Sequence, residues 1–294
     1  MRLAARPSPR QSAAGGRVRA PASGRVVSEA VSATPNHAAA RGARARINHF
    51  VRGIFEHVPA SLGGHLHRLP TRLTFGITGP FNGQRRRTAA VAAMFGAIPF
   101  GTVIETGTFR AMTTRHLHTL TQAPIATIEV NPAYFRYSQR RLAKLPRVQQ
   151  FLGKSPAVLE QLRTDQTAWH AEPVFFYLDA HWLHDLPLLD ELASIRRGWT
   201  EFAALIDDFA VDGDDGYFYD DYGPGKTLDL RHFAGHGELG DLNVFWPAAP
   251  AASESGARRG WVVLASPGAV SAALSKLSEL RAAGSLQEAL AVSG

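Results

Sequence analysis

The sequence predicts an α/β fold: a Rossmann-like, seven-stranded, mostly parallel sheet with helices on both faces and an antiparallel last pair of strands. Three observations carry this prediction. Short apolar runs alternate with helical patterns between residues 101 and 206, which is typical of parallel sheets. Two later apolar runs follow one another with no helical pattern between them, as antiparallel neighbours do. Hydrophobic residues make up 45% of the 294 residues, which is enough for a sizeable core.

The elements are expected in the following order. Residues 47–57 and 84–95 have helical spacing, and a turn-rich segment, 76–84, lies between them. Five strands with four intervening helices follow. The expected strands are 102–105, 125–129, 148–152, 174–178 and 202–206, and the expected helices are 113–121, 132–144, 155–163 and 186–197.

The last part of the chain is expected to close the sheet. The apolar runs 242–246 and 261–265 are joined by a polar connection rich in Ala, Pro and Ser. Because a hairpin-like connection suits antiparallel strands, we expect these two runs to pair at one edge. A final helix is predicted over 270–282, where leucines recur at helical spacing.

The positive charge is concentrated at the start of the chain. The net charge is +7, and residues 1–46 hold nine Arg against one acid, Glu29, which gives +8 and leaves −1 for the rest. The near-neutral body argues against nucleic acid as a partner. Few large apolar residues occur in 1–46, so we expect a disordered tail or a misassigned start. A transit peptide and a nucleic-acid-binding arm are the alternatives.

We therefore predict a tail and one domain. The predicted boundaries are 1–46 for the basic tail and 47–294 for the domain, which divides into a helical lead-in (47–100), a core sheet (101–265) and a C-terminal helix (266–294). The chain has no Cys, which excludes a disulfide scaffold, Cys-ligated zinc and thiol catalysis. The longest uncharged stretch, 88–104, is short for a membrane span and contains Pro99. We expect a cytoplasmic protein without a membrane partner.

Polar residues stand at the ends of the first three expected strands, where open α/β sheets bind ligands. Glu105 ends the first strand, and Gly107 and Thr108 follow in a turn that brings backbone close to a ligand. Glu129 ends the second strand, at the distance along the chain where an acid holds a ribose diol. Ser155 opens the third helix. The alternatives are a plain turn, a solvated acid and a helix cap.

A second group of polar residues follows the next two strands. Asp179 and His181 come after the fourth strand, and Asp207 and Asp208 after the fifth. Clustered carboxylates repel one another unless a positive charge lies among them, and a divalent cation with oxygen ligands would supply it. The alternative is that the Asp pair only caps a loop. Residues 212–222, acidic with interleaved aromatic residues, are expected to form a lid over a substrate or a plain surface loop.

Together these residues resemble the class I S-adenosylmethionine (SAM)-dependent methyltransferases, over roughly residues 75–265. The segment 103–108 is similar to that family's first motif, Glu129 to its ribose-binding acid, and 153–155 to an element near the adenine. Lys154 replaces the usual acid, and Ala111 stands where a second Gly is common. The resemblance implies SAM as the cofactor, bound by Glu105, Gly107, Thr108, Glu129, Ser155 and Asp179.

The later strand ends are similar to metal-dependent sugar O-methyltransferases of the macrocin type. In that group an Asp after the fourth strand and an Asp–Asp pair after the fifth hold magnesium, and Asp179, Asp207 and Asp208 match these positions. His181 stands where that group has a carboxylate proposed as general base, and imidazole suits proton removal near neutral pH. The resemblance implies O-methylation of a small molecule, such as a sugar, a phenol or a natural product, assisted by Mg²⁺.

Three other functions compete with this interpretation. A Rossmann-type dehydrogenase would need Gly-x-Gly-x-x-Gly after the first strand, and only Gly107 is present. A catalytically silent module of the same fold would bind the cofactor without turnover. An RNA methyltransferase would use the basic tail as an arm. The sequence leaves the acceptor and the oligomeric state open.

Overall fold

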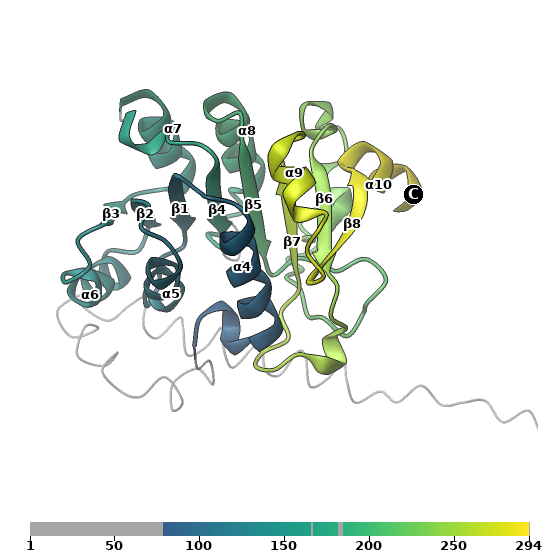
Figure 1. The fold of residues 1–294 in the computed structure, drawn as a ribbon, viewed down its shortest axis with the longest axis horizontal. Coiled ribbons are helices and arrows are strands. Elements are labelled where there is room, and N and C mark those ends of the chain that lie inside the picture. Colours follow the sequence, from purple (N-terminus) through teal and green to yellow (C-terminus); the bar gives the residue numbers. More distant parts are fainter. Residues whose placement is uncertain (1–78, 166, 182–184, 294) are drawn as a thin grey trace, which may run out of the picture. The chain divides into compact units, whose positions relative to one another are not determined.

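The computed structural model describes residues 79–165, 167–181 and 185–293. The expected tail (1–46), the boundary at residue 47 and the expected helix 47–57 lie outside the described residues. Within these ranges the chain forms an α/β structure around one sheet (Figure 1). The predicted fold class is confirmed, with one difference: the sheet has eight strands rather than seven.

The sheet has the strand order β3-β2-β1-β4-β5-β7-β6-β8. The strands are β1 (Thr102–Thr106), β2 (Ile125–Glu129), β3 (Val148–Leu152), β4 (Val174–Leu178), β5 (Phe202–Asp207), β6 (Asn243–Pro247), β7 (Trp261–Ala265) and β8 (Leu280–Ser285). The first five strands are parallel, so their carboxyl ends share one edge. The chain turns back between β3 and β4, so the two sides of β1 form a topological switch point, where α/β sheets bind ligands.

The expected antiparallel pair is present, and a third antiparallel contact extends it. β7 pairs antiparallel with both β5 and β6. β6 also pairs with β8, with Phe245 opposite Ala282 and Pro247 opposite Leu280. This last pairing corrects the predicted helix over 270–282. Without β8, β6 would be an exposed edge strand, and the sheet contact outweighs the helical spacing of the leucines.

The predicted C-terminal helix, 266–294, is therefore three elements rather than one. They are α9 (Ala269–Leu274), β8 and α10 (Leu286–Ser293). The earlier helices lie within a few residues of their predicted positions. They are α4 (Arg85–Ala97), α5 (Met112–Leu120), α6 (Pro132–Leu142), α7 (Ser155–Asp165) and α8 (Leu188–Gly198), with short 3₁₀ turns η1 (Phe81–Gly83), η2 (Thr167–Trp169), η3 (Leu230–Phe233), η4 (Gly237–Leu239) and η5 (Ala251–Ser253).

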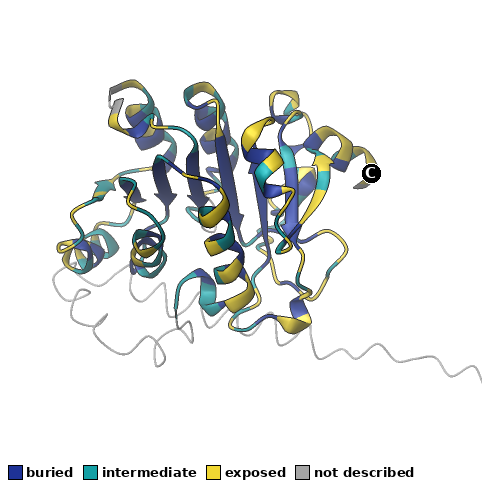
Figure 2. Ribbon diagram, viewed as in Figure 1, coloured by how far each residue is buried: buried dark blue, intermediate teal, exposed yellow. Residues whose placement is uncertain are grey.

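Helices cover both faces of the sheet, as predicted. Successive residues of a strand point to opposite faces, and neighbouring residues of β4 accordingly join different apolar clusters. Phe175 packs with α4, α5 and α9, whereas Phe176 packs with α7, α8 and α10. The central strands are buried between these layers (Figure 2). None of the helices in the described ranges has the length and apolar character that crossing a bilayer would need.

The first helix of the described chain is fixed at its N-terminus by a distant loop. The Glu254 carboxylate accepts hydrogen bonds from the backbone N–H groups of Arg86 (2.9 Å) and Arg87 (3.0 Å). The Ser255 hydroxyl accepts one from Arg85 (3.0 Å). These N–H groups have no partner inside a helix, so the β6–β7 connection caps α4 in place of a local residue. This capping holds Arg87 over the sheet.

Candidate active site

The loop after β1 lies in direct contact with the loop after β4. Gly107 has a positive φ of 85°, and a Cβ atom added there would lie 2.2 Å from the carbonyl oxygen of Asp179. The N–H groups of Gly107 and Thr108 both donate to the carbonyl of Ile128, at 2.9 and 3.0 Å. Only glycine fits this position, because both its backbone conformation and its closeness to Asp179 exclude a side chain.

Glu105 lies beneath this loop rather than on its surface. Its side chain is buried and accepts hydrogen bonds from the hydroxyls of Thr114 and Thr127. The Thr127 hydroxyl is also 2.6 Å from that of Thr108. Burial raises the pKa of Glu105 to about 7, against the opposing effect of the two hydroxyl donors. The predicted residues Glu105 and Thr108 are thus joined in one buried network that supports the loop.

Glu129 ends β2 at the same edge and is also nearly buried. One of its oxygens accepts the N–H of Phe109 at 2.7 Å, and the other accepts the N–H of Asn131 at 2.8 Å. Burial raises its pKa, and these backbone donors oppose the rise. A carboxylate oxygen can accept more than one hydrogen bond. Each oxygen of Glu129 can therefore still accept a hydroxyl group, as a ribose diol requires.

Ser155 is the first residue of α7, and its side chain is buried. It lies near Glu191 of α8, a fully buried acid that the sequence analysis did not single out. Burial raises the pKa of Glu191 to about 7, and the hydroxyls of Ser155 and Thr106 oppose this rise, although neither makes a hydrogen bond of normal geometry with it. Glu191 is thus a buried acid close to Ser155, which follows β3, and to Thr106, which ends β1.

On the other side of β1, a second cluster gathers after β4 and β5. The ligand atoms of Asp179, His181 and Asp208 all lie within 4.8 Å of one another. The backbone N–H of Asp179 donates to the carbonyl of Thr106 at 3.1 Å, which ties the cluster to β1. His181 is buried, and the two Asp residues are half-buried. These three predicted residues are therefore brought together.

Asp207 lies outside that cluster, although the sequence analysis grouped it there as a metal ligand. Its side chain is buried, and each carboxylate oxygen is occupied by two donors. One accepts the Arg87 guanidinium at 2.6 Å and the Asp208 N–H at 2.7 Å. The other accepts the Tyr177 hydroxyl at 2.6 Å and the Asn82 amide at 3.2 Å. The lone pairs that a metal ion would need are engaged by the protein.

Two arginines supply part of the positive charge that the sequence analysis assigned to a metal ion. Arg87 is fully buried, and its guanidinium also lies over the rings of Phe81, Tyr177 and Trp261 at 5.6 to 5.9 Å. Arg259 pairs with both Asp208 and Asp220. Four carboxylates thus face two guanidinium groups, and two negative charges have no partner cation in the described chain.

Asp179 is the acid in this group that has no arginine partner among the described residues. Its carboxylate accepts a long hydrogen bond, of 3.4 Å, from the Tyr177 hydroxyl. Burial, followed by the charges of Asp207 and Asp208, raises the pKa of Asp179 well above its usual range. A carboxylate in this position is stabilised by any cation that approaches it.

The segment 212–222 is tied to the sheet rather than hinged over it. The Tyr217 hydroxyl donates to the carbonyl of Ala249 at 2.9 Å. The N–H of Asp220 donates to the carbonyl of Asp208 at 2.8 Å, beside the ion pair with Arg259. Phe218 and Tyr219 are exposed large hydrophobic residues. The role of this segment in substrate binding stays a prediction.

Backbone strain is concentrated in the same segments. Six non-glycine residues in the described chain have a positive φ, a conformation that side chains with a Cβ rarely adopt. They are Phe81, Asn82, Phe109, Ala111, Asp208 and Arg258. Phe109 and Ala111 lie in the loop after β1. The other four lie at or beside hydrogen-bond partners of Asp207 and Asp208. Strain of this kind persists where surrounding contacts impose it, as they do at functional sites.

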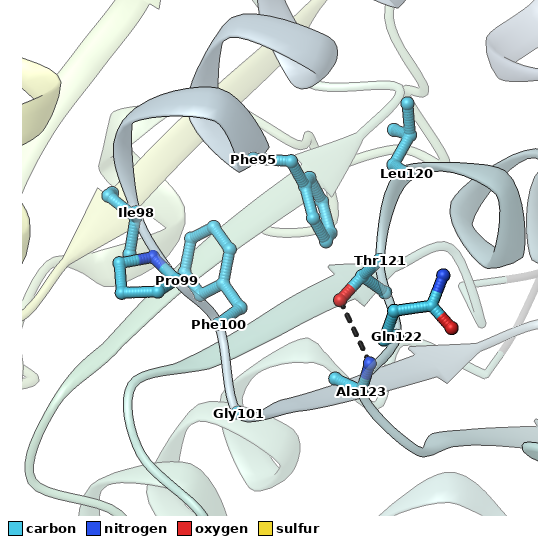
Figure 3. A pocket seen from close by; sticks show the side chains of 9 residues that line it. All are labelled: Phe95, Ile98, Pro99, Phe100, Gly101, Leu120, Thr121, Gln122 and Ala123. Atoms are coloured by element: carbon cyan, nitrogen blue, oxygen red, sulfur yellow. Dashed lines mark hydrogen bonds between the residues drawn. The ribbon is translucent and has the colours of Figure 1, made fainter.

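Two shallow pockets lie at the opposite edge of the sheet. One, of about 280 Å³, is enclosed by Phe95, Phe100 and Leu120 with their neighbours, where β1 and β2 begin (Figure 3). The other, of about 590 Å³, lies near the beginnings of β2 and β3. Ligands of α/β sheets bind at the carboxyl ends of the strands, so these pockets lie on the wrong side for the cofactor.

Comparison with known proteins gives structural likeness alone. No protein-family model matches the sequence, and no curated protein matches it. Similar solved structures include the O-methyltransferase TomG from Streptomyces achromogenes, involved in tomaymycin synthesis and in complex with SAM (17% identity, 62% of this chain, 79% of that one, TM-score 0.45). An O-methyltransferase from Bacillus cereus in complex with SAH is also similar (13% identity, 75% and 90%, TM-score 0.47).

The 23S rRNA methyltransferase ErmE is similar as well, at 12% identity, over 63% of this chain and 68% of that one, with a TM-score of 0.37. All three proteins are described as methyltransferases, two of them as O-methyltransferases and one as acting on 23S rRNA. Because the identities and TM-scores are low, any argument about function rests on this chain's own residues.

Sequence reasoning missed the residues that hold the acids in place. They are Asn82, Arg87, Tyr177, Glu191 and Arg259, whereas Asp220 belongs to the predicted acidic segment 212–222. A signal existed for two of them. Tyr177 interrupts an otherwise apolar strand just before Asp179, and a buried hydroxyl requires a partner. Arg87 belongs to a run of three Arg at the start of an otherwise apolar helix, where one must turn inward.

Proposed function

We propose that the chain is a SAM-dependent methyltransferase that methylates a hydroxyl group of a small molecule, with a divalent metal ion beside the acceptor. One observation carries this proposal. The edge of the sheet holds, on either side of β1, an acid suited to a diol and a cluster suited to a cation. The contact between Gly107 and Asp179 joins the two sites directly.

The residues of the β1–β3 side fit a nucleoside-type cofactor. The Glu129 carboxylate accepts only neutral backbone donors, and its two oxygens would suit two neighbouring ribose hydroxyls. Gly107 lets the loop after β1 pack directly against the backbone of Asp179. Ser155 would lie at the adenine end. Glu105 is too deeply buried to touch a ligand and positions Thr108 through the threonine hydroxyls.

The residues of the β4–β5 side fit a metal ion and an acceptor hydroxyl. When bound, SAM would supply an electrophilic methyl carbon: a carbon–oxygen bond would form, the carbon–sulfur bond would break with its electrons going to sulfur, and the hydroxyl proton would pass to solvent water or to His181. Asp179 and Asp208 would hold the cation, which lowers the pKa of a bound hydroxyl. His181 lies among them, as a proton acceptor or as a third ligand. Positioning of two reactants contributes up to about 7–11 kcal/mol.

Calorimetry with S-adenosylhomocysteine tests the cofactor site. We expect the full chain to bind with a stoichiometry near one, and Glu129→Ala to lose at least about tenfold in affinity, because a charge-assisted pair of hydrogen bonds is lost. Glu160→Ala is the matched control, since Glu160 is an exposed acid on α7 paired with Arg163. Absence of binding by the unmodified chain would overturn the proposal.

Turnover separates an enzyme from a silent binding module. The full chain is incubated with SAM and pools of hydroxylated sugars, phenols and polyketide-type compounds, and S-adenosylhomocysteine is measured. We expect product formation that depends on both Asp179 and Asp208. A different result would assign the activity to nucleic acid. In that case the chain binds S-adenosylhomocysteine and methylates RNA, but it releases no S-adenosylhomocysteine with any of the small-molecule pools.

A further inference from the structure

We propose that Asp179, His181 and Asp208 form a mixed carboxylate–imidazole site for a first-row transition metal ion, and that Asp207 is a positioning residue outside it. The role of this ion in catalysis rests on the proposed function, whereas its binding stands by itself. The proposal differs from the sequence prediction in two respects: His181 becomes a ligand instead of the general base, and Asp207 ceases to be one.

The state of the His181 ring is the first observation behind this assignment. The residue is only 5% exposed, and neither ring nitrogen has a hydrogen-bond partner among the described residues. Buried polar atoms are almost always paired, so an unpaired ring calls for an explanation. One of its nitrogens lies within 4.8 Å of carboxylate oxygens of both Asp179 and Asp208. A shared metal ion would satisfy all three groups.

The bonding of Asp207 is the second observation. Its oxygens accept four hydrogen bonds, two each, including the buried ion pair with Arg87. The same bonds fix the neighbouring ligands. The N–H of Asp208 donates to Asp207, and the Tyr177 hydroxyl lies 2.6 Å from Asp207 and 3.4 Å from Asp179. Asp207 therefore orients the two ligands that flank it, as the surroundings of metal sites commonly do.

The charge balance is the third observation. Arg87 is committed to Asp207, and Arg259 to Asp208 and Asp220. With all four carboxylates ionised, the two guanidinium groups of the described chain leave two formal negative charges uncompensated. A divalent cation between Asp179 and Asp208 would balance them. The arginines thus pair with Asp207, Asp208 and Asp220, and Asp179 is the acid of this group that has no arginine partner in the described chain.

The imidazole decides which ion fits. Magnesium and calcium take oxygen ligands almost entirely, whereas imidazole suits zinc, iron, nickel and copper, and manganese and cobalt accept both donor types. Two carboxylates and one imidazole are therefore a set for a first-row transition metal rather than for magnesium. Mg²⁺, which the resemblance to macrocin-type enzymes implies, should compete poorly.

Metal binding is measured directly, without turnover, on the full chain freed of metal with a chelator. Mn²⁺ is titrated and its free fraction followed by electron paramagnetic resonance, and Co²⁺ is followed by its visible absorption. We expect one Mn²⁺ per chain, poor competition by Mg²⁺, and a Co²⁺ spectrum that changes on His181→Gln. His181→Gln and Asp179→Asn should each weaken Mn²⁺ binding at least about tenfold. His236→Gln is the control, since His236 is more exposed and paired with Glu238.

Asp207→Asn separates a positioning residue from a ligand. It should keep one Mn²⁺ per chain with a smaller loss of affinity than Asp179→Asn, and its Co²⁺ visible spectrum should resemble that of the unmodified chain. If Asp207→Asn does not fold, Tyr177→Phe tests the same link from the other side, with the same expectation. No bound Mn²⁺, binding unchanged in His181→Gln, or equal competition by Mg²⁺ would each overturn the proposal.

The outcome is separable from that of the proposed function. Calorimetry with S-adenosylhomocysteine is run on the same metal-free preparations. Binding of S-adenosylhomocysteine without Mn²⁺ binding overturns the metal site alone. Binding of Mn²⁺ without S-adenosylhomocysteine overturns the proposed function and leaves the metal site standing.

Discussion

The two sides of β1 hold their acids by different chemistry. On the β2 side, Glu105 and Glu129 accept hydrogen bonds from threonine hydroxyls and backbone N–H groups. On the β4 side, Asp207 and Asp208 are held by the guanidinium groups of Arg87 and Arg259. Hydroxyl and N–H donors leave a carboxylate able to accept hydrogen bonds from further hydroxyl groups. Guanidinium groups offset only part of the negative charge of the acids around them. The first arrangement suits a neutral diol, and the second suits a cation.

Removing an arginine should therefore cost far more than removing a neutral donor. Arg87→Met leaves Asp207 buried without its cation, and we expect a loss of about 3–5 kcal/mol in the free energy of unfolding. Urea denaturation measures it. Arg163→Met, which breaks a solvent-exposed pair on α7, is the control and should change the free energy of unfolding far less.

A double variant tests whether the loss comes from the unpaired charge. Asp207→Leu combined with Arg87→Met removes both members of the pair, so a good part of the lost stability should return. If the double variant is as unstable as the sum of the single ones, the pair does not act as a unit.

The contact that joins the two sides should couple them. Gly107→Ala places a Cβ against the Asp179 carbonyl at a backbone φ of 85°. We expect about 1–3 kcal/mol of destabilisation and weaker binding of both S-adenosylhomocysteine and Mn²⁺. Gly213→Ala is a matched control, because Gly213 has a similar φ of 77° with no atom within 4 Å of an added Cβ. Loss of only one ligand would show that the sides are independent.

The same contrast explains what the sequence could predict. The strands β1 to β5 are short segments that alternate with helical patterns along the sequence, Gly107 follows β1 directly and Glu129 ends β2, so local pattern predicts both the fold and the cofactor site. β8 was missed because its pairing with β6 outweighs a helical spacing. The Arg87–Asp207 pair joins residues 120 positions apart. No local pattern reveals such a pair, so Asp207 looked like a ligand.

The smallest expected effect concerns Glu191, the buried acid near the carboxyl ends of β1 and β3. It is fully buried, and its pKa is raised from 4.5 to about 7, chiefly by burial. The unfolded chain releases this proton near pH 4.5, whereas the folded chain keeps it until about pH 7. The folded state therefore binds more protons between these values, and the free energy of unfolding falls as pH rises through this window.

Glu191→Gln removes the ionisation while keeping the shape of the side chain. We expect its unfolding free energy to fall less between pH 4.5 and 7 than that of the unmodified chain, so that the variant gains relative stability toward pH 7. Glu288→Gln is a control in which the pKa shift has the opposite sign, because hydrogen-bond donors from Ser285 lower the pKa of this exposed acid. Parallel pH profiles for the unmodified chain and Glu191→Gln would mean that Glu191 is already ionised in the folded state. Such a result would mean that the side of β1 assigned to a neutral ligand also contains a buried, ionised acid without a cation partner.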